Sequence, residues 1–291
     1  MVKLHVKKGD QSQFLYETTV EENIGELINK LVEIFNGRLK IDRLFYELET
    51  LAKHGTTLPP NMQGLTDDQI EELHLEDKWS KTCIPQGGES KSAVDPVGRR
   101  NGKAPCDKMA DILHQTREEA RTTVSKDSVT ANKCLTEKDV QEAIDKMRGS
   151  VMIVYPMGLP PHDPIKMEFD NEEDLTGTQA SKEVLDEANT SIWWASKEMT
   201  NDKKLKDYIG KNEKTKIVVK LQKKGQGAPQ REPAVSEDEQ KRMMAYYHKR
   251  QEDLKKLETE DSDAYLNSAW SDSSQLKRQF QGLNSVSWRP K

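Results

Sequence analysis

The sequence predicts an α+β fold with two small strand–strand–helix units, each similar in outline to a ubiquitin grasp. A helical, partly flexible middle joins the units, and a long charged helix and a polar tail follow them. Two observations favour this fold. At the N-terminus, short alternating apolar runs are followed by apolar residues at helical spacing, and the same order of patterns returns after residue 150.

The first unit, residues 1–80, opens with a predicted β-hairpin. Apolar residues alternate with polar ones on both sides of a turn at Gly9-Asp10. Such alternation around a glycine-containing turn is typical of two paired strands. We therefore expect the chain to begin with a two-stranded antiparallel ribbon that has one apolar face.

Helices complete this first unit. Thr19 and Glu22 form a capping box, which is the signature of a helix N-terminus. The helix is expected to end at Gly37, because glycine is common just after a helix C-terminus. A second helix is predicted over about residues 41–54, and a short one begins at the capping box of Thr66.

The middle of the chain divides into a flexible linker, residues 81–105, and a helical segment, residues 106–150. The linker is rich in Gly, Ser, Pro, Lys and Arg and lacks periodic apolar residues. In the helical segment one helix is expected around residues 109–120. A further capping box places the start of another helix at Thr136.

The second α+β unit is predicted over residues 151–224. Its first strand is Val151–Tyr155, a continuous apolar run that is typical of a buried strand. A proline-rich turn leads to a second strand at about residues 165–169. A long helix over about residues 184–199 and a final strand over residues 215–221 complete the unit.

Residues 225–291 are interpreted as a hinge, a long charged helix and a polar tail. The helix begins at a capping box of Ser236 and Glu239 and runs to about Glu260. Four adaptable apolar side chains near its start are candidate protein-interaction residues: Met243, Met244, Tyr246 and Tyr247. A docking helix and a helix packed on its own domain both fit this pattern, and a basic patch for RNA is a third interpretation.

Trp193 and Trp194 are the remaining candidates for protein interaction. Neighbouring helical residues point about 100° apart, so one ring can enter the core while the other lies at its edge. A core anchor with a rim residue is one interpretation. An interface anchor is the other, because tryptophan is enriched at binding hot spots.

Composition and motifs argue against catalysis. Apolar residues make up 34% of the chain and charged residues 33%, with acids and bases mixed and a net charge of −5. A nucleic-acid binder usually has a basic face, and no apolar run reaches the ~20 residues that span a bilayer. Three widely spaced cysteines and scattered histidines predict no metal site. We expect a non-enzymatic protein that needs no cofactor and binds other proteins.

Four unusual strings recur in order in one known family. They are residues 58–73, 151–161, 209–216 and 263–268. Together they resemble the Kurly family of cilia- and flagella-associated proteins, and the resemblance extends from Val2 to Pro290.

This resemblance implies a role in motile cilia. The implied activity is the cytoplasmic assembly of outer dynein arms, with a further role in cilium positioning and planar polarity. The implied locations are the cytoplasm and the cytoskeleton at the basal body. The expected partners are other dynein-arm assembly factors, axonemal dynein chains and chaperones. The short apolar runs and the mixed charges argue against a membrane or a nucleic acid as a partner. The alternatives are a structural component of the axoneme or basal body and an RNA-binding protein.

Overall fold

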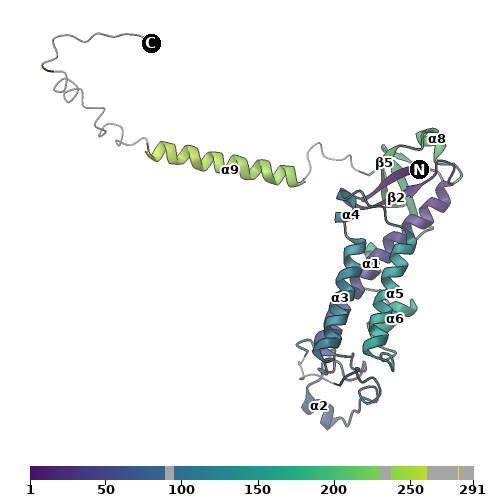
Figure 1. Cartoon of the computed structure of the whole chain (residues 1–291), viewed down its shortest axis with the longest axis vertical. Helices are drawn as coiled ribbons and strands as arrows, with labels where there is room; N and C mark the ends of the chain where they lie inside the picture. The colour runs from purple at the N-terminus through teal and green to yellow at the C-terminus, as the bar shows by residue number, and fades with distance from the viewer. Residues whose placement is uncertain (89–94, 230–236, 261–280, 282–291) are drawn as a thin grey trace. The chain divides into compact units, whose positions relative to one another are not determined.

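The chain is organised as two units, which are described separately. Met1–Arg231 forms one compact unit and Glu232–Lys291 the other. The computed structural model, drawn in Figure 1, describes residues 1–88, 95–229, 237–260 and 281. The predicted polar tail after residue 260 therefore lies outside the described residues, apart from Gln281.

Five strands in the described part of the first unit form one mixed sheet, in the order β2-β1-β5-β3-β4. They are β1 Val2–Lys8, β2 Gln11–Thr18, β3 Thr190–Trp194, β4 Lys197–Glu198 and β5 Lys216–Lys223. β1 and β2 form the predicted antiparallel hairpin. β5 occupies the last predicted strand. Both of these predictions are confirmed.

β5 joins the two ends of this unit. It pairs in parallel with β1, and Leu4 lies beside Ile217 in this register. On its other side β5 pairs antiparallel with β3. Strands of both predicted strand–strand–helix units therefore share one sheet, and the α+β class is confirmed. The domain boundaries proposed from the sequence remain predictions.

The helix α1, from Ile24 to His54, runs unbroken for 31 residues and shares the buried core with the sheet. The predicted helix end at Gly37 is wrong, for a packing reason. A Cβ atom at this position would lie 2.5 Å from Cγ1 of Val140, so glycine lets a neighbouring helix approach closely. The adjacent Asn36 also serves tertiary structure, since its amide bonds both the backbone oxygen (2.7 Å) and nitrogen (3.0 Å) of Leu185.

Two of the remaining helices, α2 and α5, begin where the capping boxes of Thr66 and Thr136 predicted. The full set of remaining helices among the described residues is α2 Asp67–Glu72, α3 Asp107–Val124, α4 Asp127–Thr130, α5 Glu137–Val154, α6 Pro164–Asp170, α7 Gln179–Glu183, α8 Lys206–Ile209 and α9 Glu237–Glu260. Figure 1 shows α3 and α5 running alongside α1. The capping box of Thr136 is formed, with its hydroxyl accepting from the backbone nitrogen of Asp139.

The strand predicted at Val151–Tyr155 is the end of α5, and that prediction is wrong. Val151 and Val154 are buried, whereas Met152 and Ile153 between them are 65% and 53% exposed. Burial at a spacing of three residues is helical. A short apolar run alone does not show whether a segment is a strand or a helix. Here the helix that begins at the capping box of Thr136 continues through the run.

The strand predicted at residues 165–169 is the helix α6, so this prediction is wrong as well. Asp163 caps it by accepting a hydrogen bond from the backbone nitrogen of Ile165 at 3.0 Å. Pro164 occupies the first turn, where its fixed φ suits a helix and its missing N–H costs nothing. Ile165 and Phe169, four residues apart, are buried on one face.

The helix predicted over residues 184–199 is also wrong, because this segment contains β3 and β4. The two strands are joined at Ala195 and Ser196, whose φ angles are 47° and 64°. Two consecutive positive φ angles make the tight turn that matches the twist of a hairpin. Such a turn usually contains glycine or asparagine, and Ala195 and Ser196 are neither.

The predicted linker, residues 81–105, is in contact with the end of α1 through its described part. Arg100 is buried, and its guanidinium donates to the carbonyl oxygen of Gly55 at 2.8 Å. It also pairs with the carboxylate of Glu47 at 2.7 Å. Residues 89–94 lie outside the described residues. The flexibility of this segment stays a prediction.

The contact at Gly37 can be tested with a matched pair of glycine variants. Gly37→Ala should lower the free energy of unfolding by about 1–3 kcal/mol, because the new methyl group meets the stiff, buried Val140. Gly149→Ala in α5 has no atom within 4 Å of its Cβ and should stabilise by about 0.5–1 kcal/mol through helix propensity. Denaturant unfolding measures both. Equal stabilisation by the two alanines would show that Gly37 is not a packing contact.

Candidate functional site

Candidate interaction residues of the second unit lie on α9, whose 24 residues form a single helix. Every side chain described from Glu239 to Lys256 is exposed. Five large apolar side chains are among them, with exposed fractions of 47%, 72%, 63%, 59% and 53%. We call these five residues the α9 patch: Met243, Met244, Tyr246, Tyr247 and Leu254.

The α9 patch occupies one side of the helix. At 3.6 residues per turn its members fall within roughly 160° of the circumference. The rings of Tyr246 and Tyr247 meet edge to face, with their centroids 6.1 Å apart. Lys241 and Lys249 fall on the opposite side by the same spacing. Arg250 and Gln251 fall within the same arc, so the α9 patch is a cluster of apolar side chains on one side of a mostly charged helix.

Pairs of charged side chains within a helix compensate little for such exposure. In α9, for example, His248 Nδ1 and Glu252 Oε1 lie 3.8 Å apart and form an ion pair when the histidine is protonated. Such pairs contribute about 0.2–0.5 kcal/mol. Most helical stability in proteins comes from packing of an apolar face, and a groove in a partner that accepted the α9 patch would supply it.

Trp193 and Trp194 lie in the first unit, side by side on β3. Because successive strand residues point to opposite faces, they have different surroundings. Trp194 packs against the core, while Trp193 lies opposite Lys220 and is half-buried. The indole nitrogen of Trp193 donates to Ser191 Oγ at 3.1 Å. Both rings are half-buried, and strand alternation places Trp194 against the core and Trp193 on the other face of the sheet.

The six candidate residues therefore fall into two groups, one in each unit. The α9 patch adds Leu254 to the four predicted helix residues. Sequence analysis missed a third feature, a pocket at the end of the sheet that is lined by four lysines. These lysines come from β1, α7 and β5, so only knowledge of the strand pairing would reveal that they meet.

No group of three or more His, Cys, Asp or Glu side chains among the described residues is arranged to hold a metal ion. Burial raises the pKa of the Cys83 and Cys134 thiols above its usual range, which reduces the fraction of reactive thiolate. No helix among the described residues is both long and apolar enough to cross a bilayer.

Comparison with known proteins gives one consistent result. The family described as cilia- and flagella-associated protein 298 matches residues 190–286. Cilia- and flagella-associated protein 298 of Danio rerio is 61% identical over all of both chains. The Homo sapiens protein of the same name is 56% identical over all of both chains, and that of Drosophila melanogaster is 50% identical over 99% of each. No solved structure matches the chain.

The part of the chain that matches the family includes both groups of candidates. Residues 190–286 contain β3, β4, β5 and α9. Trp193, Trp194 and the whole α9 patch therefore lie inside the segment by which members of the family are recognised.

Stability measurements should separate Trp194, which packs against the core, from the α9 patch. Trp194→Ala should lower the free energy of unfolding by about 2–4 kcal/mol, because it leaves a cavity beside the core. Met243→Ala combined with Tyr247→Ala should change it by less than about 0.5 kcal/mol per site, since both side chains are exposed. Thermal and denaturant unfolding of the full chain measure this, and unfolding of the double variant would place the patch in a core.

Proposed function

Because the chain belongs to the family of cilia- and flagella-associated protein 298, we propose that it is a non-enzymatic protein-binding factor for motile cilia. Its proposed task is the assembly of outer dynein arms in the cytoplasm before they are transported. A role near the basal body in positioning cilia is proposed along with it. Its proposed partners are other assembly factors, axonemal dynein chains and chaperones.

The α9 patch is the observation that carries this proposal. Methionine side chains are flexible and polarisable and adapt to different partner surfaces. Tyrosines add large rigid contact area, and both residue types are enriched in the cores of interfaces. A helix whose described apolar side chains are all exposed fits an element that is completed by a partner. Assembly factors hold incompletely built subunits, and an adaptable helix suits that task.

The charge distribution on α9 supports a protein partner over RNA. Lysines and arginines alternate with acids along the helix, as in Lys249-Arg250 followed by Glu252-Asp253. Nucleic-acid affinity depends on neutralising several phosphates with uncompensated cations. The apolar residues, by contrast, are gathered on one side. We therefore propose that the partner binds the α9 patch and not the lysines of α9.

A matched pair of variants tests this placement. Met243→Ala with Tyr247→Ala removes two anchors, and Lys241→Ala with Lys249→Ala changes the opposite side by the same number of alanines. Truncated interface anchors cost about 1–2 kcal/mol or more each, so the first variant should bind its partners roughly 30-fold more weakly. The second should bind nearly as well as the unmodified chain. Affinity purification of full-length variants from ciliating cells, quantified by mass spectrometry, is the measurement.

The same variants distinguish assembly from a structural role. In cells that lack the endogenous protein, we expect cilia that are present but poorly motile, without outer arms. The lysine variant should restore the arms, and the Met243 and Tyr247 variant should not. Electron microscopy of axonemes gives this result. Normal arms in the deficient cells would refute the assembly role. Recovery of the protein from washed axonemes in a fixed ratio to dynein would favour a structural component.

A further inference from the structure

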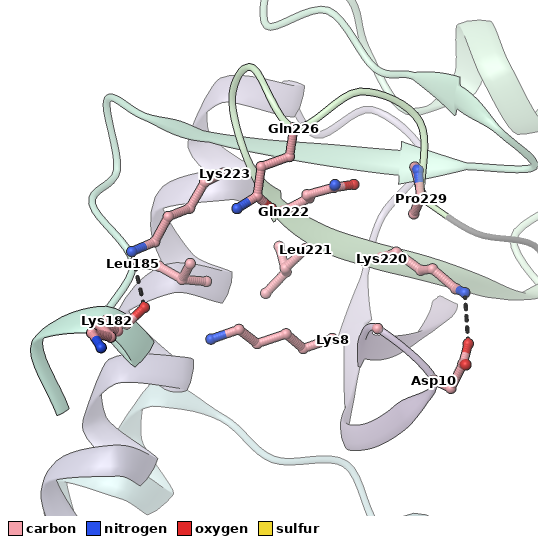
Figure 2. Close-up of a pocket in the computed structure, with 11 residues that line it drawn as sticks. Lys8, Asp10, Lys182, Leu185, Lys220, Leu221, Gln222, Lys223, Gln226 and Pro229 are labelled. Atoms are coloured by element: carbon pink, nitrogen blue, oxygen red, sulfur yellow. Dashed lines mark hydrogen bonds and ion pairs between the residues drawn. The ribbon is translucent and has the colours of Figure 1, made fainter. Parts of the chain in front are cut away.

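A pocket lies at one end of the sheet in the first unit, where the ends of β1 and β5 face the segment that follows α7. It encloses about 330 Å³, within the range of small-ligand sites. Leu185 and Leu221 supply apolar surface. Four lysines are among the other lining residues, and Figure 2 shows three of them, Lys8, Lys182 and Lys223, at the same end of the pocket.

The walls of this pocket are fixed by hydrogen bonds. The amide of Asn36 in α1 bonds both backbone groups of Leu185, which holds the segment after α7 in place. Lys8 Nζ donates to the carbonyl oxygen of Glu183 at 2.9 Å, and Lys223 Nζ donates to that of Lys182 at 3.0 Å. The two ammonium groups are thus brought to consecutive carbonyl oxygens of one helix end.

The hydrogen bonds to this helix end use only some of the N–H donors of Lys8 and Lys223. An ammonium group has three N–H donors, and each of these two lysines has one hydrogen bond to a described acceptor. Lys8 also contacts the ring of Phe35, 4.6 Å from its centroid. Donors therefore remain on both groups for a ligand that enters the pocket.

Positive charge in the pocket is only partly balanced. Lys220 pairs with Asp10 at 3.3 Å, and Asp10 is the sole carboxylate among the described lining residues. Glu183 lies near Lys8 but contributes its backbone oxygen to the contact. Burial lowers the pKa of Lys8 below its usual value, nearby Lys223 lowers it further, and Glu183 partly opposes this. The ammonium form of Lys8 is therefore held at a cost that a bound anion would relieve.

Gln222 lies next to Lys223 in the chain and has an unsatisfied polar atom. Gln222 lines the same pocket, and its side-chain oxygen Oε1 is buried without a hydrogen-bond partner. A buried acceptor without a partner costs about 1–3 kcal/mol. Side chains alternate between the two faces of a strand, so Gln222 shares the face of Lys220 and not that of Lys223, and it does not belong to the group of three lysines.

From this arrangement we propose that the pocket binds a phosphoryl group through Lys8, Lys182 and Lys223. A phosphoryl group carries nearly two negative charges and three strong acceptor oxygens, which match three ammonium groups. The group could be part of a free phosphate compound or of a phosphorylated side chain on a partner. The site lies in the first unit and does not depend on the function proposed for the α9 patch.

The test uses the full chain with three probes at constant ionic strength: inorganic phosphate, a short phosphoserine peptide and the same peptide without phosphate. Isothermal titration calorimetry should detect the two phosphoryl probes but not the unmodified peptide. Tighter binding of the phosphoserine peptide than of inorganic phosphate would identify a protein-borne source. Tighter binding of inorganic phosphate would identify a free compound. Binding of all three probes alike, or of none, would overturn the proposal.

Variants then assign the binding to this pocket. Lys182→Gln removes a lining ammonium group without removing a described hydrogen bond of its side chain, so it should fold normally and bind at least fivefold more weakly. Lys8→Gln should weaken binding at least tenfold, and its melting temperature shows whether loss of the contact to Glu183 also affects folding. Lys214→Gln, away from the pocket, is the control. Unchanged affinity in Lys182→Gln would contradict the assignment, whatever Lys8→Gln does.

Discussion

Parallel pairing between β1 and β5 connects residues more than two hundred positions apart, Leu4 beside Ile217 for example, and the rest of the first unit is arranged around it. Closing so long a loop costs conformational entropy, although that cost grows slowly with length. The compensation is apolar burial, because Val2, Leu4, Val6, Ile217 and Val219 all enter one core. Loss of this pairing would also detach β3 and β4, which reach β1 only through β5.

The helices depend on the same sheet. α1 contributes buried residues along almost its whole length to the core that the strands complete. Close approach of α5 is possible because Gly37 has no side chain. Asn36, one residue earlier, fixes the segment that leads from α7 to β3. Two neighbouring residues of one helix thus set the positions of elements on two sides of it.

Local signals in the sequence predicted local structure well. Capping boxes at Thr66 and Thr136 mark real helix starts, and Gly9 marks the turn of a real hairpin. The capping box predicted at Thr19 is wrong, because α1 begins at Ile24 and is capped by Asn23. The errors arose where a local signal had a tertiary cause. Gly37 resembles a helix end but is a packing contact, and Val151–Tyr155 resembles a strand but is the half-buried end of a helix. The hairpin of β3 and β4 turns at Ala195 and Ser196, which give no turn signal.

The two candidate sites differ in how far sequence could reveal them. The α9 patch lies on one continuous helix, so its apolar side follows directly from residue spacing. The lysine pocket combines Lys8 with Lys182 and Lys223, and nothing in the sequence indicates that these residues meet, because long-range strand pairing has no local signature.

Partner binding through the α9 patch is tested most directly by site-specific photo-crosslinking in ciliating cells. A crosslinking residue in place of Met244, which is 72% exposed, would be compared with one in place of Lys249 on the opposite side of the helix. The expected result is crosslinks to axonemal dynein chains or their assembly factors from position 244, with far fewer from position 249. Equal crosslinking from both positions, or none from position 244 while the partners still copurify, would contradict the proposal.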